Sequence, residues 1–155
     1  PFQVWPMSPA EARQAITARI AALAPDASYQ QGAEAWTEAK VPLVPELTPE
    51  PAAQLSFYVD NRVLTLIPSR ASAIESLYVS SVWVIRFLYR LRASSRVADW
   101  DLCSAAEAAL WRHLLAWELD QLRLVPSSDF VQRRILGDWI VSELRFYVQF
   151  PTDAE

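Results

Sequence analysis

The longest regular alternation of apolar and polar positions lies in residues 77–92 (LYVSSVWVIRFLYRLR). Every second side chain from Leu77 to Leu91 is apolar except Ser81, and this period of two predicts a β-strand with one apolar face. At about 3.3 Å per residue the strand would reach about 50 Å, whereas common strands have about 5–6 residues. We therefore expect Leu77–Phe87 to lie in the core, packed on the second helix, and Tyr89–Arg92 to project beyond it as a basic, aromatic tip.

A helix is predicted from Ser8 to the residue before Pro25. Ser8 can cap the helix, Pro9 suits its first position, and Glu11 can close a capping box. The apolar stripe that would face the core consists of Ala12, Ile16, Ile20 and Leu23.

Residues 1–7 (PFQVWPM) precede this helix as an extended, uncharged arm, and residues 8–155 are expected to form a single α+β domain. If Met7 is the natural start, the six residues before it are an added extension. If it is not, Phe2 and Trp5 make the arm a candidate for docking on a neighbouring subunit.

Shorter strand patterns follow the first helix. A short strand is expected around Ala35–Ala39, and a Pro-rich, extended connection comes after it. Leu55–Val59 and Val63–Ile67 flank the pair Asp60-Asn61, which is typical of a tight turn. These two segments are therefore predicted to form a β-hairpin.

A second hairpin is predicted near the C-terminal end. Phe130–Ile135 and Trp139–Phe150 flank a turn that contains Gly137, and Leu122–Val125 is a short strand or a connection. The expected fold class is α+β, with an antiparallel or mixed sheet of about four to five strands packed on two main helices, one strand being very long.

The second helix, predicted over Asp99–Leu119, is apolar on two sides. Asp99 and Asp101 would lie at its positive N-terminus. Trp111 and Leu115, beside Glu107, lie opposite the main stripe, so the helix is either sandwiched within the fold or covered by another subunit. That main stripe consists of Leu102, Ala106, Ala109, Leu110, His113 and Trp117, with His113 expected to be a satisfied core histidine.

Composition narrows the classes of partner. The 155 residues are 52% hydrophobic and include seven Trp, a residue type that fills cores and is enriched at interfaces. A pI near 5.0 argues against nucleic acid as the main partner. Arg86 interrupts the best apolar run, which excludes a membrane helix there, and the lone Cys103 fits a reducing compartment.

Charge is unevenly distributed along the chain. Residues 1–61 carry a net charge of −4, residues 62–98 carry +5, and residues 99–155 carry −5. A head-to-tail contact between unlike surfaces would use this polarity. The alternative interpretation is that charges simply solvate the ends of the strands.

Residues for common catalytic or metal chemistry are missing. With two glycines the chain offers no usual phosphate-binding loop, and one His and one Cys exclude the common zinc sets. Cys103 and His113 are ten residues apart on one predicted helix and point in different directions, so they cannot pair there. We expect no enzymatic activity, no cofactor and no bound metal.

The order of these segments is helix, Pro-rich region, hairpin, very long strand, helix and closing hairpin with ELRFYVQF. Over Ser8–Phe150 this layout resembles the tail terminator (minor tail, or tail completion) proteins of long-tailed bacteriophages. The resemblance implies a hexameric ring on the head-proximal end of the tail tube, which ends tube polymerisation and offers the surface that joins the head. It also implies assembly in the host cytoplasm and a final location in the tail or neck of the virion.

The implied partners are further copies of the chain, the tail tube protein, a head-completion or neck protein, and DNA passing transiently through the lumen. Ring contacts join two different patches of each subunit. We hypothesise that Trp111 and Leu115 lie in one patch and that the end of the long strand lies near the other. The N-terminal arm would make a further contact. The strand-end residues are Arg86, Tyr89, Arg90 and Arg92, and the arm residues are Phe2 and Trp5.

Two alternatives remain open. One is another neck or connector protein of the same particle. The other is a small-ligand binder in which the strands curl into a cup lined by Trp83, Phe87 and Phe146, with Ser81 and Ser142 as its inward polar groups.

Overall fold

The computed structural model describes residues 7–23, 36–38, 55–61, 64–68, 77–91, 96–117 and 122–152. These residues form two helices and six strands, and the predicted α+β class is confirmed. The elements are α1 (Pro9–Ala21), β1 (Thr37–Glu38), β2 (Leu55–Asp60), β3 (Leu66–Pro68), β4 (Leu77–Arg90), α2 (Arg96–Leu115), β5 (Arg123–Leu136) and β6 (Trp139–Thr152).

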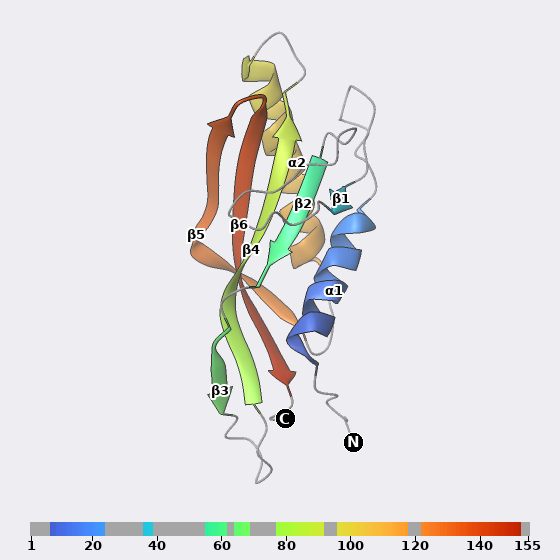
Figure 1. Ribbon diagram of the computed structural model, residues 1–155, viewed down its shortest axis with the longest axis vertical. Helices are drawn as coiled ribbons and strands as arrows, with labels where there is room; N and C mark the ends of the chain where they lie inside the picture. Colours follow the sequence, from blue (N-terminus) through green and yellow to red (C-terminus); the bar gives the residue numbers. More distant parts are fainter. Residues whose placement is uncertain are drawn as a thin grey trace.

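Four antiparallel strands in the order β2-β4-β6-β5 make up most of the sheet. The two-residue β1 pairs in parallel with β2 at one edge, and β3 pairs with β4. The strands β4, β5 and β6 each contain 14 residues, where the sequence predicted one very long strand. Figure 1 shows these strands running along the long axis of the molecule, with α2 behind them and α1 beside β2.

The core lies on one face of the two central strands, β4 and β6, which pair from Leu77↔Thr152 to Arg90↔Trp139. Alternate side chains of both strands are at most 3% exposed, which confirms the predicted apolar face. Burial of such large side chains is the main stabilising contribution to the fold. The buried set is Val79, Ser81, Trp83, Ile85, Phe87 and Tyr89 on β4, and Ile140, Ser142, Leu144, Phe146, Val148 and Phe150 on β6.

Both helices contribute to this same core. The helix α1 has the predicted capping box between Ser8 and Glu11 and buries Ala12, Ile16 and Ile20. The helix α2 buries Cys103, Ala106, Leu110 and Leu114 in the same cluster.

His113 lies where the two helices touch. Its ring Nε2 donates to the Arg19 carbonyl oxygen at 2.9 Å, and Arg19 Nη2 donates to the His113 carbonyl oxygen at 3.0 Å. The histidine is half-buried at the contact between the helices, and its ring has a hydrogen-bond partner there, as expected.

The hairpin predicted around Asp60 does not form. Leu55–Asp60 pairs with residues 84–89 of β4, and Leu66–Pro68 pairs with residues 77–79 of the same strand. Between them the Ser80 N–H donates to the Thr65 carbonyl oxygen at 3.0 Å. Thus β2 and β3 follow one another along a single edge of β4, because a long strand offers one edge to both segments.

The strand β5 (Arg123–Leu136) also differs from expectation, since it is one long strand where a short strand or connection and a second short strand were predicted. The register of β5 against β6 shifts between Pro126 and Val131, so that residues 127–130 lie opposite the single residue Arg145. The predicted hairpin turn at Gly137 is confirmed.

The expectation that β4 projects from Tyr89 onward is wrong for Tyr89. This side chain is 0% exposed, and its backbone pairs with Leu55 on one side and Ile140 on the other. Beyond it the Leu91 N–H donates to the Asp138 carbonyl oxygen at 2.9 Å, which keeps the strand end attached to the β5–β6 turn. The strand is long because its neighbour β6 is equally long and pairs with it from Leu77 to Arg90.

The boundaries of α2 also differ from those predicted. The helix begins at Arg96 and not at Asp99, so Asp99 and Asp101 lie inside its first two turns and not at its first residues. Asp99 is 1% exposed, whereas Asp101 is exposed.

Candidate interaction surfaces

A small apolar pocket opens where the β5–β6 hairpin meets the beginning of α2. Its volume is about 240 Å³, and we call it the end pocket; its lining residues are Leu91, Val97, Trp100, Ile135 and Ile140. Val97 is 72% exposed and Ile135 is 48% exposed, so they form its rim, while the 1% exposed Ile140 forms its floor. These apolar side chains make the end pocket a candidate contact surface.

The hairpin turn positions the floor and rim of the end pocket. Gly137, with a φ of 58°, is the only described residue in the left-handed region, as a two-residue turn with Gly first requires. This turn places Ile135 directly opposite Ile140 on the inner face of the sheet. The next residue, Leu136, is 41% exposed and extends the apolar surface at this end.

A buried ion pair holds β5 against α2. Glu107 is 2% exposed and accepts two hydrogen bonds from Arg133, one of them from Nε to Oε2 at 2.6 Å. The Ser142 hydroxyl also donates to Oε2 at 2.6 Å. The hydrogen bond to Glu107 raises the pKa of Arg133, so this guanidinium stays charged. The three residues join α2, β5 and β6.

Sequence reasoning missed this ion pair because it placed Glu107 beside Trp111, opposite the main apolar stripe of the helix, and assigned it no partner. The alternation of inward and outward side chains in β5 could have predicted this ion pair. Arg133 takes the inward position opposite Ser142, and an inward Arg needs a carboxylate partner. The guanidinium also lies 5.8 Å from the centre of the Trp100 ring, which connects the pair to the end pocket.

Cys103 is buried near the ion pair and has none of the features of a nucleophile. Its side chain is 0% exposed, and burial, together with the negative charge of Glu107, raises the pKa of the thiol. A thiol held in its neutral form is unreactive. Among the described residues, no three His, Cys, Asp or Glu side chains gather where they could bind one metal ion.

The opposite face of the sheet carries a row of charges that crosses three strands. Arg86 Nη1 donates to Asp60 Oδ2 at 2.5 Å, and its Nε lies 3.6 Å from Glu143 Oε1. Arg145 then donates to Glu143 at 2.9 Å. We call these four residues the charge row. The basic strand segment therefore finds acidic partners from both acidic blocks within its own subunit.

Trp111 and Leu115, predicted to form one patch, differ in exposure. Trp111 is half-buried and packs edge-on against Phe130 of β5, with ring centres 6.4 Å apart. Phe130 in turn packs on Phe146 in the core at 5.0 Å. Leu115 is 40% exposed. At Trp111 the second apolar side of α2 is covered from within the chain, while Leu115 stays available for a partner.

Two of the other predicted interface residues lie at the end of β4, and they differ in exposure. Arg90 is exposed at the end of β4, with its guanidinium 5.9 Å from the Trp139 ring centre, whereas Tyr89 is inside the core and offers no surface. Phe2, Trp5 and Arg92 lie outside the described residues.

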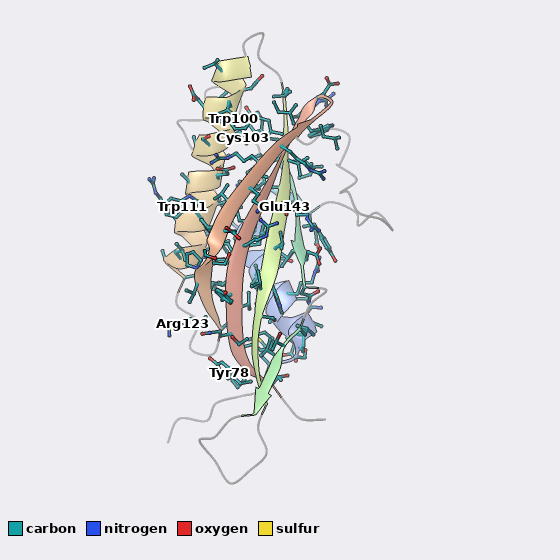
Figure 2. The ribbon with its side chains drawn as sticks, turned by 90° about the vertical axis from the view of Figure 1, so that its left-hand side faces the viewer. Tyr78, Trp100, Cys103, Trp111, Arg123 and Glu143 are labelled. Atoms are coloured by element: carbon teal, nitrogen blue, oxygen red, sulfur yellow. The ribbon has the colours of Figure 1, made fainter. Side chains whose placement is uncertain are left out.

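Figure 2 shows Trp100 and Trp111 along α2 and Glu143 on the sheet. The end pocket, the surface around Leu115 and the charge row are therefore three separate surfaces of the subunit.

The cup predicted by the ligand-binding alternative is filled by side chains. Trp83 packs edge-on against Phe150 at 5.8 Å, and Phe87 packs against Trp36 at 5.0 Å. Phe146 is 0% exposed, and the two serines, Ser81 and Ser142, are at most 3% exposed. Trp83 Nε1 donates to Ser81 at 3.0 Å, so that hydroxyl serves the core.

No family model matches the chain, and its comparison with curated proteins finds no similar sequence. Within the described residues, neither helix is long and apolar enough to cross a membrane.

Proposed function

We propose that this chain is a structural subunit of a phage or phage-like tail, which assembles into a ring on the head-proximal end of the tail tube. There it ends tube polymerisation and offers a surface for the head-joining proteins. The proposal starts from the resemblance over Ser8–Phe150 and is supported by where the subunit exposes its surfaces.

The observation that carries the proposal is the presence of several unlike surfaces on one elongated subunit. The end pocket is apolar, the charge row lies on the other side of the sheet, and Leu115 is exposed at the far end of α2. A ring requires two different patches on each subunit, because each copy contacts its neighbours in a head-to-tail manner. A subunit with one dominant apolar patch would instead favour a two-fold dimer.

The small-ligand alternative has less support. Sites for small molecules commonly have volumes of about 300–1,000 Å³ and a few convergent polar groups. The end pocket is smaller, at about 240 Å³, and all five of its lining residues are apolar. Its dimensions suit a protruding side chain of another protein better than a free ligand.

The test is a capping assay with tubes polymerised from the tail tube protein encoded in the same genome. Purified chain is added during polymerisation, and tube lengths and ends are measured by electron microscopy. We expect shorter tubes with a ring of density at one end, and native mass spectrometry should detect a closed oligomer released from such tubes.

A matched variant assigns the effect to a specific surface. Leu115→Asp places a charge on an exposed side chain and should prevent ring closure without unfolding the domain, whereas Leu64→Asp, at a residue of similar exposure, should cap normally. If the unmodified chain never alters tube length or tube ends, the proposed function is wrong. Monomeric behaviour without tubes does not count against it, since tubes can supply the template for the ring.

A further inference from the structure

The end pocket lies at the opposite end of the molecule from the point where the described chain begins. The Met7 N–H donates to the Pro151 carbonyl oxygen at 2.9 Å, and Pro151 pairs with Tyr78. Ile140, the floor of the end pocket, lies eleven residues before Pro151 on the same strand, which at about 3.3 Å per residue is about 36 Å along β6. Figure 2 shows Trp100, beside the pocket, and Tyr78 near opposite ends of the molecule.

The arm that precedes Met7 cannot bridge this distance. Phe2 lies five residues before Met7 in the sequence, and five residues span at most about 18 Å even when fully extended. Neither Phe2 nor Trp5 can therefore enter the end pocket of its own subunit, and the same limit holds whatever precedes Pro1.

The chemistry of the arm matches the chemistry of the pocket. Residues 1–7 contain no charged side chain and two aromatic ones, and the pocket is lined by five apolar side chains. Its volume of about 240 Å³ suits one bulky aromatic anchor, and buried Trp side chains are frequent binding hot spots. Two prolines in the arm restrict its backbone, which lowers the entropic cost of ordering it on a partner.

We infer that the end pocket binds the N-terminal arm of a second copy of this chain, with Trp5 or Phe2 as the anchor. The contact joins opposite ends of two subunits, so it goes beyond the lateral contacts of the proposed ring. Two copies lying antiparallel would exchange arms reciprocally, and copies placed end to end would form a row. The inference does not require the tail function.

Cysteine cross-linking tests the contact directly. One preparation carries Val4→Cys, which keeps both aromatic anchors of the arm, a second carries Val97→Cys, and the two are mixed under mild oxidation. The native Cys103 is 0% exposed and gives no background. We expect a disulfide between positions 4 and 97 of different chains, identified by peptide mass, to form at least about tenfold faster than in a matched mixture of Val4→Cys with Tyr147→Cys. Tyr147 is 41% exposed on the other face of the sheet and serves as the control.

A double variant with both cysteines in one chain shows whether the pocket binds the arm of its own chain or the arm of a second copy. Linked dimers or ladders support the inference and distinguish the antiparallel pair from the row. A monomer with an internal disulfide, or linking no faster than in the Tyr147→Cys control, overturns it.

Self-association measured by sedimentation gives an independent readout. The double variant Phe2→Ala/Trp5→Ala, which changes no described residue, should weaken association by about tenfold or more, equivalent to at least about 1.4 kcal/mol. Unchanged association would count against the inference. A chain that cross-links but never caps tubes refutes only the proposed function, and a chain that caps tubes but never cross-links refutes only this inference.

Discussion

Glu107, Arg133 and Ser142 show how single residues fix the position of an edge strand in this fold. Glu107 is 2% exposed, while the Arg133 side chain is 33% exposed. The carboxylate therefore depends on its protein partners for the hydrogen bonds that water would otherwise supply, whereas the guanidinium keeps some contact with water. This difference makes the two halves of the ion pair unequal in their effect on stability.

Removing the arginine should cost more than neutralising the acid. We expect Arg133→Leu to lower the free energy of unfolding by about 3–5 kcal/mol, because it leaves a buried carboxylate without its charged partner. Glu107→Gln keeps the shape and some hydrogen bonds and should cost about 1–2 kcal/mol. Urea denaturation followed by Trp fluorescence measures both changes.

The neighbouring Arg134, exposed on the other face of β5, provides the control for this comparison. Arg134→Leu should change the unfolding free energy by less than about 1 kcal/mol, as surface charges usually do. A larger loss for Glu107→Gln than for Arg133→Leu would contradict the assigned roles.

Cys103 should be protected from thiol reagents in the folded protein. Because burial raises its pKa above the ordinary 9.0, its contribution to stability is complete below about pH 9 and is lost as the pH rises, since the unfolded thiol ionises first. The loss should approach about 1.4 kcal/mol per pH unit above that point. Unfolding free energies at pH 8 and pH 10 for the natural chain and for Cys103→Ala should differ in slope, and equal slopes would exclude this linkage.

At the scale of elements, the strands β4 and β6 determine the architecture. They pair over their full lengths and bury alternate side chains against both helices. The shorter segments β2 and β3 are positioned by β4, and β5 is positioned by β6 and by the contact with α2. A tight two-residue turn joins β5 to β6, so its geometry sets the register of residues 131–136 against β6, up to the shift between Val131 and Pro126.

Gly137 is the residue in that turn whose substitution should have the largest effect. A Cβ there would meet no other atom within 4 Å, so any cost comes from its positive φ of 58° and not from a clash. We expect Gly137→Ala to destabilise the protein by about 1–2 kcal/mol. Thermal unfolding of this variant beside Asp138→Ala, which has a negative φ and should change stability little, checks the assignment.

At the scale of the whole molecule, part of the charge on the described residues is neutralised by ion pairs within the subunit. Arg86 of the basic segment pairs with Asp60 and lies close to Glu143, and these two acids come from the acidic blocks that precede and follow that segment in the sequence. The uneven charge along the chain therefore helps to bring distant segments together. Apolar surface at the end pocket remains the better candidate for contacts between copies.

Self-association through the end pocket should depend little on salt. Between about 0.1 M and about 1 M salt the screening length falls from about 10 Å to about 3 Å, which weakens contacts between exposed charges. We expect the association constant measured by sedimentation to change by less than about twofold across this range, because apolar contacts carry it. A fall of tenfold or more would assign the contact to charged side chains such as Arg90.

Periodicity predicted the parts of the fold that depend on local pattern. The alternation in residues 77–90 and 139–150, the capping box at Ser8 and the turn at Gly137 all appear in the structure as expected. Pairing partners were harder to predict. The pair Asp60-Asn61 is typical of a hairpin turn, but β2 and β3 instead pair one after the other with the same edge of β4, which is long enough for both. The end pocket and the Glu107–Arg133 pair combine residues from distant elements, which a single sequence does not bring together.

The register shift in β5 has a consequence for solubility. An uninterrupted edge strand of 14 residues would offer a long row of unpaired backbone groups to another chain, and such edges promote aggregation. Residues 127–130 break this row, and Pro126 removes one donor just before the break. Only two short straight runs remain, residues 123–126 and 131–136. The strand can thus be long enough to hold α2 in place while being a poor template for fibre growth.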